Sequence, residues 1–93
     1  MELEFTWDPA KSAVNHRKHG LDFEEALTAF DDPMSTTIPD PAHSAGERRF
    51  LLLGRTRNQA LVVVSHTERG DTIRIISARR ATRREKMTYE EGI

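Results

Sequence analysis

The sequence predicts an α+β domain in which two N-terminal helices pack on an antiparallel sheet and a short helix ends the chain. The predicted elements follow the order β-α-α-β-β-β-β-α, with four strands in series after both helices. Strands joined by short turns pair as antiparallel hairpins. The chain has 93 residues without a linker or a repeat, so we expect one domain over residues 1–93.

Both N-terminal helices are predicted from the signals at their ends. Apolar and polar residues alternate in a short strand at 3–7, after which Asp8 and a proline start the first helix. Gly20 ends this helix, and Asp22 begins the second as its N-cap residue. Apolar residues three and four positions apart line one side of the second helix until Pro33 stops it.

The remaining strands are bounded by turn signals. The centres of two of them are apolar at consecutive positions, so we expect the sheet to be covered on both faces. A C-terminal helix, which begins at Thr82 with a capping box to Glu85 and stops at Gly92, could cover part of the second face. The predicted strands are residues 34–38, 49–55, 60–68 and 71–79.

The charges are divided between the two halves of the chain. The net charge is only −1, which taken alone argues against a nucleic-acid-binding protein. Residues 1–47 carry 3 basic and 10 acidic side chains, whereas residues 48–93 carry 11 basic and 5 acidic ones. Most of the cations are arginine, which binds phosphate through a planar fork of donors. The partition indicates a C-terminal half that binds a polyanion; the alternative is two solvated faces of opposite sign.

Several classes of protein are excluded by composition and motifs. The chain has no cysteine, which rules out disulfides and thiolate metal sites, and it contains no recognised nucleotide-binding or zinc-protease motif. The longest apolar run, at 60–64, is too short to span a bilayer, and the N-terminus does not resemble a signal peptide. We therefore expect a cytoplasmic protein without membrane association, metal or cofactor.

The last predicted hairpin carries a candidate proton-transfer pair. Pairing Thr67 with Thr72 places His66, Glu68 and Arg79 on one face of the sheet. A histidine and a glutamate beside a cation suit acid–base chemistry at a phosphate. In the alternative interpretation, the histidine lies at the edge of the core and the glutamate belongs to the turn.

Five cations occur within residues 79–86, where the last strand ends and the last helix begins. Backbone N–H groups at a helix N-terminus also attract anions, so cations and helix dipole could act together on a phosphate. Arg55 and Arg57, in the preceding hairpin, could join the same patch. The alternative is a solvated helix face.

Seven short motifs occur in a fixed order along the chain. They are Trp7-Asp8-Pro9-Ala10-Lys11, Asn15-His16-Arg17-Lys18-His19-Gly20, Phe23-Glu24-Glu25-Ala26, Phe30-Asp31-Asp32-Pro33, His66-Thr67-Glu68-Arg69-Gly70, Arg74-Ile75-Ile76-Ser77-Ala78-Arg79-Arg80-Ala81 and Tyr89-Glu90. From about residue 3 to residue 92 this series resembles the BrnT family of toxins. The resemblance implies a ribonuclease toxin of a type II toxin–antitoxin pair with a fold similar to that of RelE toxins. It also implies a BrnA-like ribbon-helix-helix antitoxin, in a complex that represses its own operon, so that operator DNA is bound only through the antitoxin.

Chemistry and resemblance together predict an endoribonuclease that cleaves mRNA, free or ribosome-bound, without a metal and so inhibits translation. Such cleavage needs a base, an acid and cations around the transition state. The alternative is a non-catalytic module that binds nucleic acid or a partner protein. We expect the antitoxin to lie across residues 79–84, and Tyr89 either to stack on a base or to pack the last helix. The candidate catalytic residues are His66, Glu68, Arg79, Arg55 and His19, and the candidate substrate-binding residues are Lys18, Arg74, Arg80, Arg83 and Tyr89.

Overall fold

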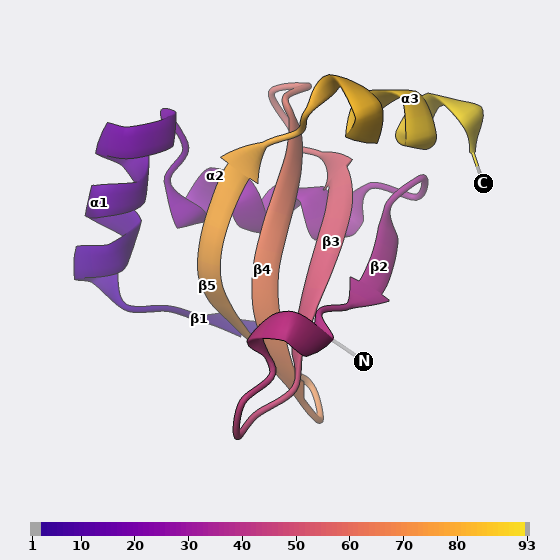
Figure 1. Cartoon of the computed structure of the whole chain (residues 1–93). Helices are drawn as coiled ribbons and strands as arrows, with labels where there is room; N and C mark the ends of the chain where they lie inside the picture. The colour runs from indigo at the N-terminus through magenta and orange to yellow at the C-terminus, as the bar shows by residue number, and fades with distance from the viewer. Residues whose placement is uncertain (1–2, 93) are drawn as a thin grey trace.

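The computed structural model describes residues 3–92, which form a five-stranded sheet with helices on one face and at one end (Figure 1). The outermost residues of the predicted domain, 1, 2 and 93, lie outside the described part. None of the described helices is long and apolar enough to span a membrane. The elements are β1 (Glu4–Thr6), α1 (Pro9–His19), α2 (Phe23–Leu27), the 3₁₀ helix η1 (Thr28–Asp31), β2 (Thr36–Pro39), the 3₁₀ helix η2 (Pro41–His43), β3 (Arg49–Arg55), β4 (Leu61–Arg69), β5 (Thr72–Arg80) and α3 (Arg83–Glu91).

The sheet has the order β1-β5-β4-β3-β2, and β1 runs parallel to β5. The prediction of a fully antiparallel sheet is therefore wrong at this edge, although the other neighbours are antiparallel. A parallel pair needs a long crossover, and every other helix and strand except α3 lies between β1 and β5 in the sequence. Phe5 fixes β1 in place, because its ring packs edge-on against Phe30 at 5.1 Å. Alternation within the strand predicts its apolar face but not its direction.

The starts of all three α-helices and the end of α1 agree with the sequence signals. The second helix, predicted to continue until Pro33, is α-helical only to Leu27 and continues as the 3₁₀ helix η1 to Asp31. Asp8 and Asp22 each accept a hydrogen bond from a backbone N–H of the first helical turn, and Gly20 closes α1 in the left-handed conformation. The predicted capping box between Thr82 and Glu85 begins α3. These local hydrogen bonds satisfy backbone donors that a helix end would otherwise leave unpaired.

One hydrophobic core lies between the helices and the face of the sheet that they cover (Figure 1). Gly54 allows η1 to approach β3, because a Cβ atom at this position would lie 3.0 Å from the carbonyl oxygen of Ala29. On the opposite face, in the described part of the chain, α3 lies at one end of the strands and the short η2 at the other, without a layer over the middle (Figure 1). The sheet is therefore not covered on both faces as predicted. The buried core residues are Leu21, Phe23, Ala26 and Ala29 from the helical layer and Leu52, Val62, Val64, Ile75 and Ala78 from the sheet.

The hairpin of β4 and β5 has a different register from the predicted one. Thr67 lies opposite Arg74 rather than Thr72, because the strands extend further and leave a turn of only Gly70 and Asp71. Glycine suits this turn, since its φ is +55°. A shift of two positions still leaves each side chain of this part of the hairpin on its predicted face.

A β-bulge then reverses the faces in the second half of β5. The register shifts immediately before His66, where β5 has one additional residue, Ile76. Arg79 consequently lies opposite Val63, which is on the other face of β4 from His66. The predicted shared face of the proton-transfer pair and Arg79 is therefore wrong.

The turn from β3 to β4 contains the only non-glycine residue with positive φ among residues 3–92, Gln59 at 69°. Its backbone N–H donates to the carbonyl oxygen of Thr56 at 2.8 Å, and the N–H of Thr56 donates to the carbonyl oxygen of Ala60 at 2.8 Å. Glycine is the usual residue at the left-handed position of such a hairpin loop. A strained residue is often retained beside a functional site.

Replacing Gln59 by glycine should stabilise the protein by about 0.5–1 kcal/mol, because glycine adopts this conformation without a steric cost. The measurement is urea unfolding, with an increased midpoint and an unchanged slope. Gln59→Ala serves as the control, since alanine also lacks the amide group but keeps the strain. Equal midpoints for the two variants would show that the backbone conformation contributes no strain.

Candidate functional site

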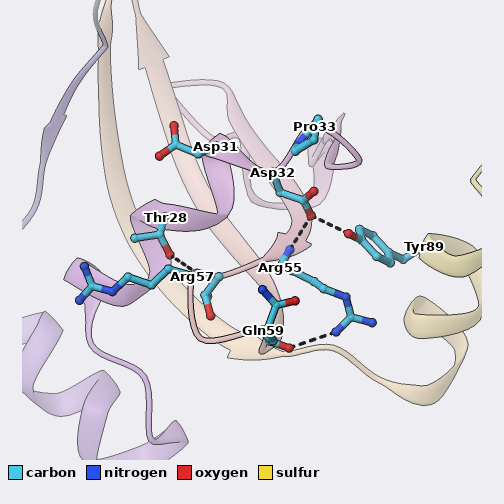
Figure 2. Close-up of a pocket in the computed structure, with 9 residues that line it drawn as sticks. Thr28, Asp31, Asp32, Pro33, Arg55, Arg57, Gln59 and Tyr89 are labelled. Carbon is cyan, nitrogen blue, oxygen red and sulfur yellow. Dashed lines mark hydrogen bonds between the residues drawn. The ribbon is translucent and has the colours of Figure 1, made fainter.

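A cavity of about 570 Å³ lies between η1, the turn from β3 to β4, and α3 (Figure 2). Two residues from the predicted site, Arg55 and Tyr89, meet in it although 34 positions of sequence separate them. The lining residues are Thr28, Asp31, Asp32, Pro33, Arg55, Thr56, Arg57, Gln59 and Tyr89.

Tyr89 and Arg55 are held against each other by Asp32 (Figure 2). The Tyr89 hydroxyl donates to the Asp32 carboxylate at 2.7 Å, and the backbone N–H of Arg55 donates to the same oxygen at 2.8 Å. The guanidinium carbon of Arg55 lies 5.3 Å from the centroid of the Tyr89 ring, within the range of a cation–π contact. Its Nη1 also donates to the carbonyl oxygen of Gln59 at 3.0 Å, so the strained turn helps to position the cation.

The electrostatics of this cluster keep Asp32 ionised and Tyr89 protonated. Burial acts to raise the pKa of Asp32, but hydrogen bonds from Tyr89 and from two backbone N–H groups outweigh it and lower that pKa. The hydrogen bond to Asp32 in turn raises the pKa of Tyr89, because an anionic phenolate would face a carboxylate. Tyr89 is consequently a fixed donor, and Asp32 is a hydrogen-bonded anchor rather than a free base.

The cavity offers a cation and an aromatic ring to a bound molecule. Arg55 retains guanidinium N–H groups beyond the one given to Gln59, and these can bind phosphate oxygens. The Arg57 backbone N–H donates to the Thr28 hydroxyl at 2.9 Å, while its side chain extends away from Tyr89 (Figure 2). A phosphate and an unpaired base together match this set of groups.

His66, the foremost candidate for the proton transfer, is fully buried. Its ring lies between Phe30, edge-on at 4.9 Å, and Phe50, stacked at 6.0 Å. Nδ1 is 3.1 Å from the carbonyl oxygen of Val64, and Nε2 is 3.0 Å from a carboxylate oxygen of the exposed Glu68. The ring lies inside the core rather than at its edge, and Glu68 belongs to β4 rather than to the turn, so the alternative interpretation holds only in part. Because the ring is buried, we do not include His66 in the proposed site.

Arg79 forms a bidentate ion pair with Glu85 of α3. The distances are 2.8 Å from Nη1 to Oε1 and 2.9 Å from Nη2 to Oε2. The Arg79 guanidinium lowers the pKa of Glu85 to about 2. Both terminal nitrogens of Arg79 are therefore engaged in fastening α3 to β5, which leaves this residue less available for phosphate than the sequence pattern predicts.

Replacing Glu85 by glutamine should lower stability by roughly 1 kcal/mol near neutral pH, after allowance for solvent screening of this half-exposed pair. A carboxylate with a lowered pKa stabilises the fold above its unfolded pKa, and this contribution disappears as the pH falls through its folded pKa. The difference between wild type and variant should thus be full above about pH 4.5 and vanish towards pH 2. Urea unfolding across this range measures it; a difference independent of pH would contradict the assignment.

The other predicted site residues are distributed over the surface. Lys18 and His19, at the end of α1, line a shallow groove with Ile76 and Ser77. Arg74 lines a separate groove. Arg80 lies near Gly20, and Arg83 is exposed at the start of α3. No three His, Asp or Glu side chains between residues 3 and 92 are placed to hold a metal ion together.

Asp32 and Gln59 are not among the predicted site residues, although Asp32 belongs to the motif Phe30-Asp31-Asp32-Pro33. Asp32 contacts Arg55 and Tyr89, which lie 23 and 57 positions further along the chain, and no local pattern reports such pairs. The sequence does not predict the left-handed conformation of Gln59 either, because glycine is the residue type that indicates such a conformation in a hairpin loop.

A family model describing the ribonuclease toxins of type II toxin-antitoxin systems matches residues 7–85. The chain belongs to this family, BrnT. A crystal structure of the Brucella abortus ribonuclease toxin BrnT at 1.1 Å resolution is similar, with a TM-score of 0.67 and 24% identity over 87% of this chain and 99% of that chain. No functionally curated protein matches the chain. Family membership confirms the predicted resemblance and implies RNA as substrate and an antitoxin as partner, and the structural similarity confirms the α+β class.

Proposed function

We propose that this toxin binds single-stranded RNA in the cavity of Arg55 and Tyr89 and cleaves it without a metal ion. The observation that carries the proposal is the placement of the Arg55 guanidinium 5.3 Å from the Tyr89 ring, inside this cavity. A base that stacks near the tyrosine would bring the adjoining phosphate towards the arginine. Duplex RNA would not fit this mode of binding, since its bases are already stacked.

In the proposed reaction a ribose 2′-oxygen attacks the adjacent phosphorus and the bond to the 5′-oxygen breaks. The hydroxyl proton passes to water, and water returns a proton to the departing 5′-oxygen, so that a 2′,3′-cyclic phosphate and a 5′-hydroxyl are formed. Negative charge develops on the phosphoryl oxygens, and Arg55 is placed to stabilise it, as a metal ion does in other nucleases. Asp32 acts as a positioning residue, because its hydrogen bonds hold Tyr89 and the Arg55 backbone.

The proposal includes the consequences for the cell. Cleavage of mRNA in the cytoplasm would inhibit translation, and a ribbon-helix-helix antitoxin would neutralise the toxin and bind operator DNA within the complex. Membership of a type II toxin–antitoxin family supports this setting. The fold similar to RelE toxins, implied by the motif resemblance, is part of the same proposal.

The test is cleavage of a labelled single-stranded RNA by the purified chain, in EDTA and in magnesium. We expect the same rate in both and products that carry a 2′,3′-cyclic phosphate. The same sequence annealed into a duplex should resist cleavage. A strict requirement for a divalent cation would refute metal independence, and preferential cleavage of the duplex would refute the stacking mode.

A further inference from the structure

A groove with an almost entirely aliphatic floor lies on the sheet face that α1 and α2 leave uncovered. Its floor consists of Ile38 from β2, Leu51 and Leu53 from β3, and Val63 from β4, and its volume is about 270 Å³. Strand pairing places these residues on one face, because Ile38 lies opposite Leu51 and Leu53 lies opposite Val63. The main core cluster occupies the other face of the sheet. Within the floor Val63 is itself buried, at 4% exposure, Leu51 and Leu53 are half-buried, and Ile38 is exposed.

The groove continues to the edge of the sheet and to the proposed catalytic cavity. Ile38 is 53% exposed on the edge strand β2. A second, smaller hollow shares Thr36 and Leu53 with the groove and extends to Met34, which is 59% exposed, and to Tyr89. A molecule seated in the groove would therefore lie next to the helix that carries Tyr89 into the cavity.

The charges around the floor are positive. Arg84 of α3 lies on the rim, and Arg49 is on the same face as Leu51, two positions away along β3. The carboxylate on the rim, Glu85, is already paired with Arg79. An occupant with carboxylates beside its apolar side chains would complement both the floor and its surroundings.

The chemistry of this face favours a protein over RNA. RNA-binding surfaces use aromatic rings on which bases stack. The four phenylalanines and the tryptophan pack instead on the helix side of the sheet or against His66, and Tyr89 faces the cavity. Aliphatic floors with a charged rim are typical of grooves that bind an amphipathic protein segment.

We infer that this groove, defined by Ile38, Leu51, Leu53 and Val63, is the docking site for an amphipathic segment of the antitoxin that carries aliphatic and acidic side chains. The inference rests on the proposed function only in that the partner is an antitoxin. Occupation of the groove covers α3 on the side next to Tyr89, and so links antitoxin binding to loss of RNA cleavage. The sequence predicted an antitoxin contact across residues 79–84. The inferred docking site lies on the sheet face beside these residues.

The experiment compares Ile38→Asp with Leu3→Asp in the full chain. Leu3 is a matched control, because it is 48% exposed and precedes β1 at the opposite edge of the sheet. Affinity for the purified full-length antitoxin is measured by calorimetry, and cleavage of single-stranded RNA is measured on the same preparations. We expect Ile38→Asp to weaken antitoxin binding about 10-fold or more with its RNA cleavage retained, and Leu3→Asp to change neither.

A second variant reports on the charge of the rim. Arg84→Glu should also weaken binding, and more strongly at low salt, whereas Arg17→Glu on the exposed surface of α1 should not. Unchanged antitoxin affinity in Ile38→Asp would overturn the inference. Loss of RNA cleavage by Ile38→Asp with antitoxin binding intact would also overturn it, because this face of the sheet would then bind RNA. Conversion of a dimer of this chain to a monomer by Ile38→Asp, with antitoxin binding unchanged, would assign the groove to a second copy and overturn it too. Inactivity of the wild type on RNA would count against the proposed function but leave the binding comparison valid.

Discussion

Replacing Arg55 by alanine should reduce cleavage of single-stranded RNA by about 100-fold or more, the usual effect of removing one preorganised group that stabilises transition-state charge. The Arg55 side chain contacts the Tyr89 ring and the Gln59 carbonyl oxygen at the edge of the cavity, outside the hydrophobic core. The fold should therefore remain intact, and the loss should appear in kcat rather than in thermal stability. Arg55→Lys should recover only part of the rate, because an ammonium keeps the charge but not the planar fork.

The controls for this prediction come from neighbouring arginines. Arg57→Ala should have a smaller effect, since the Arg57 side chain extends away from Tyr89 (Figure 2), and Arg17→Ala should have none. Initial rates at saturating RNA, together with circular dichroism of each variant, separate catalysis from folding. Wild-type cleavage by Arg55→Ala would show that the reaction takes place elsewhere; the groove of Lys18 and His19 would then be the next surface to test.

Local chemistry explains why so much of the fold could be predicted. Asp8, Asp22 and Thr82 are cap residues whose hydrogen bonds involve only the next few positions. Local sequence is therefore sufficient to predict them. The bounds of β3 were predicted to the residue, because turn-forming residues and changes in polarity mark both ends. In each case the interaction that defines the element lies within the element.

The arrangement of the site depends on contacts that no local pattern reports. A single additional residue, Ile76, moves Arg79 to the other face of the sheet, and nothing in the apolar run around it distinguishes a bulge from a regular strand. The Tyr89 hydroxyl reaches Asp32 across 57 positions of sequence. The residue types in the sequence therefore predict the class of reaction better than they predict which residues come together in the site.

Some cations of the positive half are already paired with carboxylates. Arg79 is paired with Glu85, and the exposed Arg69 is paired with Glu47. The proposed RNA cavity contains Arg55 and Arg57 beside two aspartates. The charge partition in the sequence thus indicates a polyanion-binding protein, while the pairing of individual charges decides which arginines are available for it.

Asn15 is the buried polar residue that joins α1 to the sheet. Its Nδ2 donates to the carbonyl oxygens of Leu21 and Ala78, each at 2.8 Å, and its Oδ1 accepts the backbone N–H of Ala78 at 3.2 Å. β1 pairs only with the first part of β5, up to Arg74. The amide of Asn15 therefore forms the hydrogen bonds to the Ala78 backbone that a neighbouring strand would otherwise form, at a position that β1 does not reach.

Replacing Asn15 by alanine should lower the free energy of unfolding by about 3 kcal/mol, because buried backbone groups of Leu21 and Ala78 would lose their partners. Asn15→Asp should be similarly damaging, since a carboxylate cannot donate to either carbonyl oxygen and would be buried as a charge. Asn58→Ala is the matched control: Asn58 is exposed in the turn before β4 and should change stability by less than about 0.5 kcal/mol. Urea unfolding of the three variants measures the effect. Equal urea midpoints for Asn15→Ala and Asn58→Ala would mean that water replaces all three hydrogen bonds of Asn15 at no cost in free energy. The Asn15 amide would then not be the group that holds α1 on β5.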